Sequence, residues 1–165
     1  MGKKTRSAGT PGLTRLVEAG VAHTVRAYEH GEAVSSAVGY GAEAAQALGV
    51  EPDRVFKTLM VAAGPRHVLC VVPVSRQLDL KATAQTLGEK QAAMAAPDVA
   101  ERVSGSVVGG ISPLGGRTSL PVVIDESAAS YETILVSAGK RGLDVELSPA
   151  DFLRITDGKT AAIAR

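Results

Sequence analysis

The chain has 165 residues, of which 18 are basic and 17 acidic, so its formal net charge is +1. This length fits a single domain with a full hydrophobic core. The balanced charge argues against a broad basic face that would hold nucleic acid, so an RNA contact would be local or assisted by a partner. Hydrophobic residues make up 45% of the chain and aromatic residues only 3%, so aliphatic side chains must build the core.

The single cysteine, Cys70, excludes an internal disulfide and fits a reducing cytosol. No apolar run approaches the ~20 residues that a membrane-spanning helix needs, and the basic N-terminus lacks the apolar segment of a signal peptide. We therefore expect a cytoplasmic protein that makes no membrane contact. Residues 1–9 are expected to form a disordered basic tail, and residues 10–165 a single domain.

In the N-terminal third, Thr10-Pro11 is typical of a helix N-cap followed by proline in the first turn. It predicts a short helix that ends near Ala19. Residues 21–29 are then expected to form a β-strand, and residues 30–39 a loop. An alanine-rich helix is predicted over residues 40–48, and the glycine that follows it directly is typical of a helix end.

The middle of the chain predicts a β-hairpin, in which strands over residues 55–63 and 67–74 flank a Gly64-Pro65 turn. The second strand is apolar on both faces, which favours a central position in a sheet. A helix over residues 79–87 and a short strand over residues 90–94 should follow.

A helix over residues 97–103 is predicted to lead into a glycine-rich loop. Three strands and a final helix then follow, at residues 120–124, 133–137, 143–147 and from Ser148 onward. Helices and strands interleave, but glycine-containing turns make at least two antiparallel hairpins. The pattern therefore predicts an α+β fold with a mixed, curved, barrel-like β-sheet flanked by helices, rather than a doubly wound parallel sheet.

Lys57 lies within a predicted strand, in phase with the aliphatic residues Val55, Leu59 and Val61. Lysine is rarely buried unless a partner meets its charge. Either this face of the strand lines a pocket, or the ammonium group reaches solvent at an edge. In a partly dry cleft, the ammonium group would bind a phosphate, a carboxylate or a developing oxyanion.

The glycine-rich loop over residues 106–116 has four glycines within eight residues. Glycine accepts positive φ and leaves room for a ligand close to the backbone. Such a loop can present bare N–H groups to an ester carbonyl, a phosphate or a ribose. Alternatively, its glycines only make the turns of a compact surface loop.

Other chemical motifs are incomplete. Residues 110–118 lack the lysine of a phosphate-binding loop, and neither a dinucleotide fingerprint nor a nucleophile elbow is present. His67 and Cys70 would point to opposite faces of one strand, so we expect no metal site and no cofactor. Cys70 is interpreted as a core residue rather than a nucleophile.

A second charged segment lies at a predicted hairpin tip, where Lys140 and Arg141 either are solvated or meet an RNA backbone. Asp144 alternates with Glu146 on the polar face of the next strand, so both carboxylates are expected to face solvent.

Three stretches together resemble the YbaK family, free-standing relatives of the editing domain of bacterial prolyl-tRNA synthetase. They are Phe56–Leu59, Val108–Gly115 and Val136–Asp144, within a likeness that runs from about Leu13 to the C-terminus. The resemblance implies a barrel-like mixed sheet flanked by helices and the hydrolytic editing of mischarged tRNA. In the YbaK branch the substrate is Cys-tRNA(Pro), its own thiol attacks the ester, and prolyl-tRNA synthetase and tRNA are the partners.

The resemblance also assigns residues. Lys57 matches the family's essential lysine. The loop whose backbone holds the aminoacyl end matches Gly109, Gly110, Ile111, Ser112 and Pro113. Further pocket positions match Tyr28, Thr58, Ser137, Gly139 and Asp144. Ala138 and Tyr40 depart from residues common in the family, which leaves the amino-acid preference open. The alternatives are an Ala-tRNA(Pro) deacylase and a non-catalytic module that binds aminoacyl-tRNA or a nucleotide.

Overall fold

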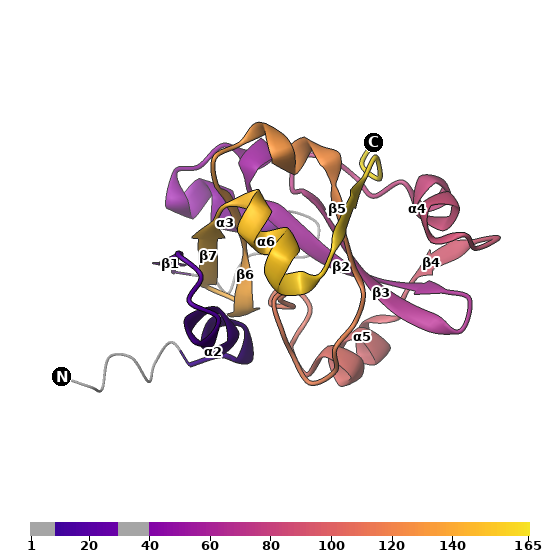
Figure 1. Ribbon diagram of the computed structural model, residues 1–165, viewed down its shortest axis with the longest axis horizontal. Helices are drawn as coiled ribbons and strands as arrows, with labels where there is room; N and C mark the ends of the chain where they lie inside the picture. The colour runs from indigo at the N-terminus through magenta and orange to yellow at the C-terminus, as the bar shows by residue number, and fades with distance from the viewer. Residues whose placement is uncertain (1–8, 30–39) are drawn as a thin grey trace.

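The structure of the chain is a computed structural model that describes residues 9–29 and 40–165. The expected tail over residues 1–9, apart from Gly9, and the expected loop over residues 30–39 lie outside the described residues. Within these limits the strands form two sheets, with helices packed around them (Figure 1).

The smaller sheet has three strands in the order β1-β7-β6, and the larger has five strands in the order β4-β2-β3-β5-β8. The strands are β1 (Thr24–Ala27), β2 (Phe56–Ala63), β3 (Arg66–Pro73), β4 (Ala92–Met94), β5 (Val122–Asp125), β6 (Ile134–Lys140), β7 (Leu143–Leu147) and β8 (Lys159–Ala161). Strand β5 pairs in parallel with both β3 and β8, whereas the other pairs are antiparallel. The predicted α+β fold with mixed strands is confirmed.

The expected barrel-like closure is wrong. Among the described residues, the two sheets are joined by a single parallel bridge between Val55 and Leu135. Beyond this bridge, β2 pairs along its whole length with β3, and with β4 at Val61–Ala63. The ladder partners of β2 therefore belong to the larger sheet, and each sheet keeps its own edge strands.

The α-helices begin and end close to the predicted positions. They are α2 (Pro11–Glu18), α3 (Tyr40–Leu48), α4 (Leu80–Leu87), α5 (Pro97–Ser104) and α6 (Pro149–Thr156), with short 3₁₀ helices η1 (Pro52–Arg54) and η2 (Glu126–Ser130). The predicted caps are present: side chains of Thr10, Asp79 and Ser148 accept backbone N–H groups at 3.2, 2.9 and 3.1 Å. These bonds satisfy donors that the first helical turn leaves unpaired.

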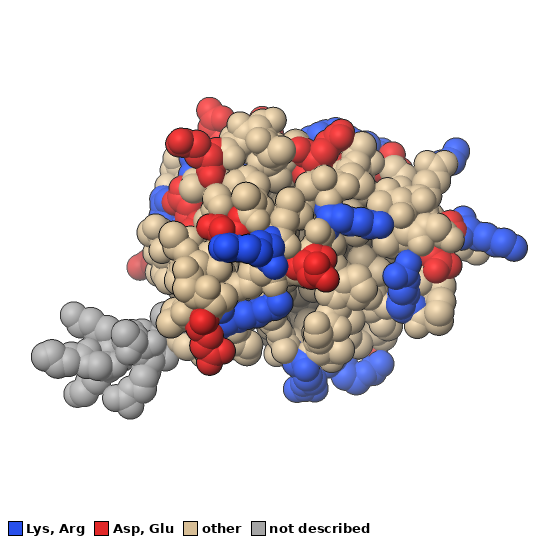
Figure 2. All heavy atoms as spheres, in the orientation of Figure 1, with Lys and Arg blue, Asp and Glu red and all other residues tan. Residues whose placement is uncertain are grey.

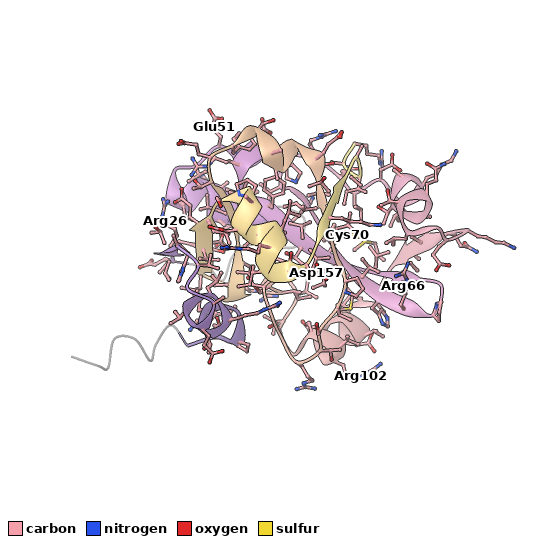
Figure 3. The ribbon with its side chains drawn as sticks, viewed as in Figure 1. Arg26, Glu51, Arg66, Cys70, Arg102 and Asp157 are labelled. Carbon is pink, nitrogen blue, oxygen red and sulfur yellow. The ribbon has the colours of Figure 1, made fainter. Side chains whose placement is uncertain are left out.

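The hydrophobic core lies on both faces of the larger sheet. Leu69 and Val71 of β3 pack with α2, α6 and the smaller sheet, whereas Val68, Cys70 and Val72 pack in a second cluster that includes residues of α4. This confirms the central position predicted for β3. Cys70 is fully buried among the strands (Figure 3), and burial raises the pKa of its thiol to about 12, as expected of a core residue.

Asp125 ends β5 and holds the C-terminal segment. Its buried carboxylate accepts the backbone N–H groups of Ile163 at 3.0 Å, Ala164 at 2.9 Å and Ser127 at 3.1 Å. Burial alone would raise the pKa of Asp125, but these hydrogen bonds outweigh it and hold the pKa below the ordinary value. The ionised form is therefore the form that stabilises the fold.

We predict that Asp125→Ala lowers the free energy of unfolding at pH 7 by about 2–5 kcal/mol, because three N–H groups lose a charged acceptor. Since the folded pKa is depressed, this contribution is present above the unfolded pKa and is lost as pH falls through the folded pKa. Urea unfolding at several pH values measures both effects. The exposed neighbour Glu126→Ala should change the free energy by less than about 0.5 kcal/mol, and equal effects of the two variants would contradict the assignment.

Candidate active site

A cavity of about 300 Å³ lies between strand β2, helix α5, the smaller sheet and the glycine-rich loop. Its wall is mainly apolar, and its polar groups come from Tyr28, Lys57, Thr58, Ser137 and Asp144. All five polar residues belong to the predicted set. Concave, mostly apolar pockets with few convergent polar groups are typical of small-molecule sites.

The predicted loop residues divide between two places. Gly109 and Ile111 line the main cavity, whereas Ser112 and Pro113 line a much smaller one beside Arg15. The Ser112 hydroxyl is buried and accepts the N–H of Leu114 at 3.1 Å, so it caps a turn of the loop. Its surroundings give it no access to the main cavity.

Gly110 and Gly139, which were also predicted for the site, do not line the cavity. A Cβ atom on Gly110 would come within 2.8 Å of the backbone of both Lys140 and Arg141, so this position tolerates only glycine for reasons of space. Gly139 has φ +123° and packs against Thr10. Both glycines allow the loop, the hairpin β6–β7 and the start of α2 to approach one another closely.

Lys57 lies on β2, opposite Val72 of β3, and lines the cavity in a half-buried position; β4 borders β2 only at Val61–Ala63. Burial lowers the pKa of its ammonium group. Within the described part of the chain, no carboxylate forms an ion pair with Lys57. Next to it, the Thr58 hydroxyl is buried and has no hydrogen-bond partner among these residues, so it is an unsatisfied polar group beside the cavity.

Asp144 departs from the sequence expectation. Asp144 lies on β7, the middle strand of the smaller sheet, lines the cavity and is only 5% exposed instead of facing solvent. Burial raises the pKa of Asp144 to about 7, although Arg26 on the neighbouring strand opposes this (Figure 3). Burial and the nearby Asp144 in turn raise the pKa of Tyr28 to about 12.

Glu146 also differs from the expectation of a solvated carboxylate. It forms ion pairs with Arg26 at 2.5 Å and Arg54 at 2.6 Å and accepts the Thr133 hydroxyl at 2.5 Å. The hydrogen bond from Thr133 and the two arginines hold the pKa of Glu146 below its ordinary value, against the effect of burial. This network ties β1, β7 and η1 to Thr133, the residue before β6.

Backbone N–H groups of the loop form the other polar wall. The N–H of Gly110 donates to Val107 O at 2.9 Å and closes a turn, in which Gly109 has φ +91°. Positive φ at the third turn position favours glycine or asparagine. The N–H groups of Gly109, Ile111 and Ser112 have no partner within the described residues, so Gly109 and Ile111 can offer donors on the cavity side.

The apolar wall contains residues that sequence reasoning missed. Met94, Pro97 and Ala100 come from β4 and α5 and close one side of the cavity. Apolar side chains near a strand end carry no motif, and only the tertiary fold places them here. Among the described residues, no three His, Cys, Asp or Glu side chains gather as a metal site would require, and no helix is long and apolar enough to cross a membrane.

The chain is similar in sequence to proteins of one known family. The family model described as aminoacyl-tRNA editing domain matches residues 36–155. EbsC of Enterococcus faecalis, named as a candidate Cys-tRNA(Pro)/Cys-tRNA(Cys) deacylase, is 40% identical over 122 residues, which are 72% of this chain and 73% of that protein. The multifunctional Ser/Thr-tRNA deacylase ProXp-y of Escherichia coli is 32% identical over 91 residues, or 54% of either chain.

The fold itself is shared with a solved structure. A crystal structure of a candidate trans-editing enzyme for prolyl-tRNA synthetase superposes with a TM-score of 0.79, covering 95% of this chain and 99% of that chain at 23% identity. At this identity the likeness concerns the fold alone.

The fold and the cavity define a class of α+β domains in which a strand lysine and a glycine turn line one cavity. Within that class, the chain belongs to the YbaK/ProX family of aminoacyl-tRNA editing domains, a family of aminoacyl-tRNA deacylases.

We predict that Asp144→Asn stabilises the protein at high pH. The pKa of about 7 in the folded protein lies above the unfolded value of 3.8, so the folded state binds more protons between these pH values. The free energy of unfolding of the wild type should therefore fall as pH rises through this window. From pH 5 to pH 8, the free energy of unfolding of the variant should increase by about 2 kcal/mol relative to that of wild type. If the free energies of unfolding of the two proteins, measured with urea, changed with pH in parallel, the assignment would be contradicted. The variant Glu132→Gln, at an exposed position, is the control.

Proposed function

We propose that the chain removes cysteine from mischarged Cys-tRNA(Pro). The observation that carries this proposal is the combination, in one small, mainly apolar cavity, of the Gly109 turn and the Lys57 ammonium group, which has no ion-pair partner among the described residues. Such a cavity can hold the aminoacyl ester at the end of a tRNA and stabilise charge that develops on its carbonyl oxygen. The likeness to EbsC supports cysteine as the amino acid.

The cavity wall lacks the usual parts of a protein nucleophile. No histidine or cysteine is among its residues in the described part of the chain, and the Ser137 hydroxyl accepts the N–H of Gly139 at 3.1 Å. A serine or threonine hydroxyl is a weak nucleophile unless a base activates it, and among the described residues neither Ser137 nor Thr58 donates its hydroxyl to Asp144, the carboxylate of the cavity. We infer that the nucleophile comes with the substrate.

The proposed reaction uses the thiol of the bound cysteine. Its sulfur attacks the ester carbonyl carbon, the carbon–oxygen bond to the ribose breaks, and the thiol proton ends on the ribose oxygen. The resulting thiolactone is then opened by water to give free cysteine. Holding sulfur and carbonyl in an attack geometry can lower the barrier by ~7–11 kcal/mol.

The residues of the chain would supply position and electrostatics. N–H groups of the Gly109 turn would donate to the ester carbonyl oxygen as it gains negative charge. Lys57 would oppose the same charge, or hold a phosphate or ribose oxygen of the terminal adenosine. Burial of Lys57 strengthens either interaction, because the local dielectric is lower than in water.

We also propose that tRNA and prolyl-tRNA synthetase are the partners, in the cytoplasm. On the face shown in Figure 2, basic and acidic side chains are interspersed, and no broad basic surface covers it. With a net charge of +1, non-specific attraction to tRNA would be weak. Binding to the synthetase, which itself binds tRNA, would compensate for this weak attraction.

The central prediction concerns release of labelled amino acid from Cys-tRNA(Pro) and Ala-tRNA(Pro). Wild type should release cysteine and leave alanine bound, and Lys57→Ala should reduce cysteine release by at least about 100-fold while remaining folded by circular dichroism. Release of alanine instead would assign the chain to an Ala-tRNA(Pro) deacylase. Release of neither, with tight binding of a cysteinyl-adenosine analogue, would favour a binding module. Ser-tRNA and Thr-tRNA are further substrates to compare, given the likeness to ProXp-y.

Ser112→Ala should retain deacylation within about threefold of wild type, because its hydroxyl caps a turn outside the main cavity. Removal of the hydrogen bond should lower the free energy of unfolding by about 1 kcal/mol. A folded Ser112→Ala protein without activity would instead assign this hydroxyl as a nucleophile.

A further inference from the structure

The peptide groups around Val108 are held from two sides. Its N–H donates to Glu101 Oε2 of α5 at 2.8 Å. Its carbonyl oxygen accepts two bonds from Arg141 at the turn of the β6–β7 hairpin, from Nε at 2.9 Å and from Nη2 at 2.6 Å. The Arg141 guanidinium therefore binds the glycine-rich loop, which differs from the two outcomes considered for a basic hairpin tip, solvent and RNA.

The hydrogen bonds from Arg141 to Val108 O determine where the N–H of Gly109 points. The described chain contains no cis peptide bond, and in a planar trans peptide the C=O of one residue and the N–H of the next point in opposite directions. Because Arg141 binds Val108 O, the N–H of Gly109 points away from the guanidinium. Gly109 itself lines the cavity, and its N–H has no partner among the residues that the structure describes.

The turn has a second conformation to which it could flip. With positive φ at Gly109 and a bond from Gly110 N–H to Val107 O, the turn has the hallmarks of type II. A type I turn over the same residues differs by rotation of the central peptide, which would present the Val108 carbonyl oxygen where the Gly109 N–H now lies. That rotation would break both bonds to Arg141.

We propose that Arg141 is a positioning residue that holds the Gly109 N–H toward the ester carbonyl oxygen of the substrate. This inference rests on the proposed deacylation. Other contacts keep the hairpin in place for this role: the Ser106 hydroxyl donates to Gly139 O at 3.2 Å, and Gly110 packs directly on the Arg141 backbone. Glu101 assists by fixing the preceding N–H.

The test compares Arg141→Ala with Lys140→Ala, its exposed neighbour at the same hairpin tip. On Cys-tRNA(Pro), Arg141→Ala should lower kcat about 10–100-fold with KM and salt dependence unchanged, because the lost function is one oriented donor. Methylguanidinium at millimolar concentration should restore part of kcat. Lys140→Ala should keep the wild-type kcat and should not respond to methylguanidinium.

A phosphate contact by Arg141 would give a different pattern and overturn the proposal. KM would then rise, the salt dependence would become shallower, and kcat would stay near wild type. If Arg141→Ala does not fold, Arg141→Lys provides the test. Lysine keeps the charge but cannot make the two hydrogen bonds of the guanidinium group. A reduced kcat supports the positioning role, and a wild-type kcat overturns it.

A measurement without substrate separates this proposal from the proposed function. In protein labelled with ¹⁵N-glycine, the Gly109 amide signal should shift or split in Arg141→Ala and stay unchanged in Lys140→Ala. An unchanged Gly109 signal in Arg141→Ala would overturn the positioning role even if deacylation is confirmed. If wild type deacylates no substrate but the signal shifts, the proposed function fails and the conformational role of Arg141 stands.

Discussion

The site depends on the docking of the glycine-rich loop onto the β6–β7 hairpin. Ile111 and Leu114 anchor the loop in the core, and Arg15 donates to Leu114 O at 2.8 Å. At the other end, the absence of a side chain on Gly110 lets the loop backbone lie against the hairpin backbone. Only this docking brings the Gly109 turn to the same cavity as Lys57, whose strand belongs to the other sheet.

The cavity carries groups that destabilise the fold. Lys57 is half-buried without an ion-pair partner in the described chain, and the buried Asp144 has a pKa of about 7. Burying ionisable groups in this way costs free energy, which the hydrogen-bonded Asp125 and the aliphatic core offset elsewhere. Groups that are poorly satisfied in the folded protein can gain from a ligand, and this favours a binding role over a structural one.

Local chemistry predicted much of the fold from the sequence. Thr10, Asp79 and Ser148 were identified as caps because capping needs only neighbouring atoms, and the Gly64-Pro65 turn marked the central hairpin. Pairing between distant strands was harder: β8 is short and exposed at a sheet edge, and the separation of the two sheets has no local signal. Alternation along the strand could not predict the burial of Asp144 either, because it separates the two faces of a strand but does not show what covers each face. The resemblance to known motifs supplied its place in the pocket.

The central claim is that the substrate, and not the protein, provides the nucleophile. The most direct measurement compares wild-type release of cysteine and of S-methylcysteine from otherwise identical tRNA(Pro). A cavity of about 300 Å³ leaves room for one added methyl group, and competition by the S-methylated substrate would verify that it enters. The account predicts rapid release of cysteine and release of S-methylcysteine at the uncatalysed rate. Similar rates for both would contradict the thiol mechanism and assign the attack to water or to a group of the protein.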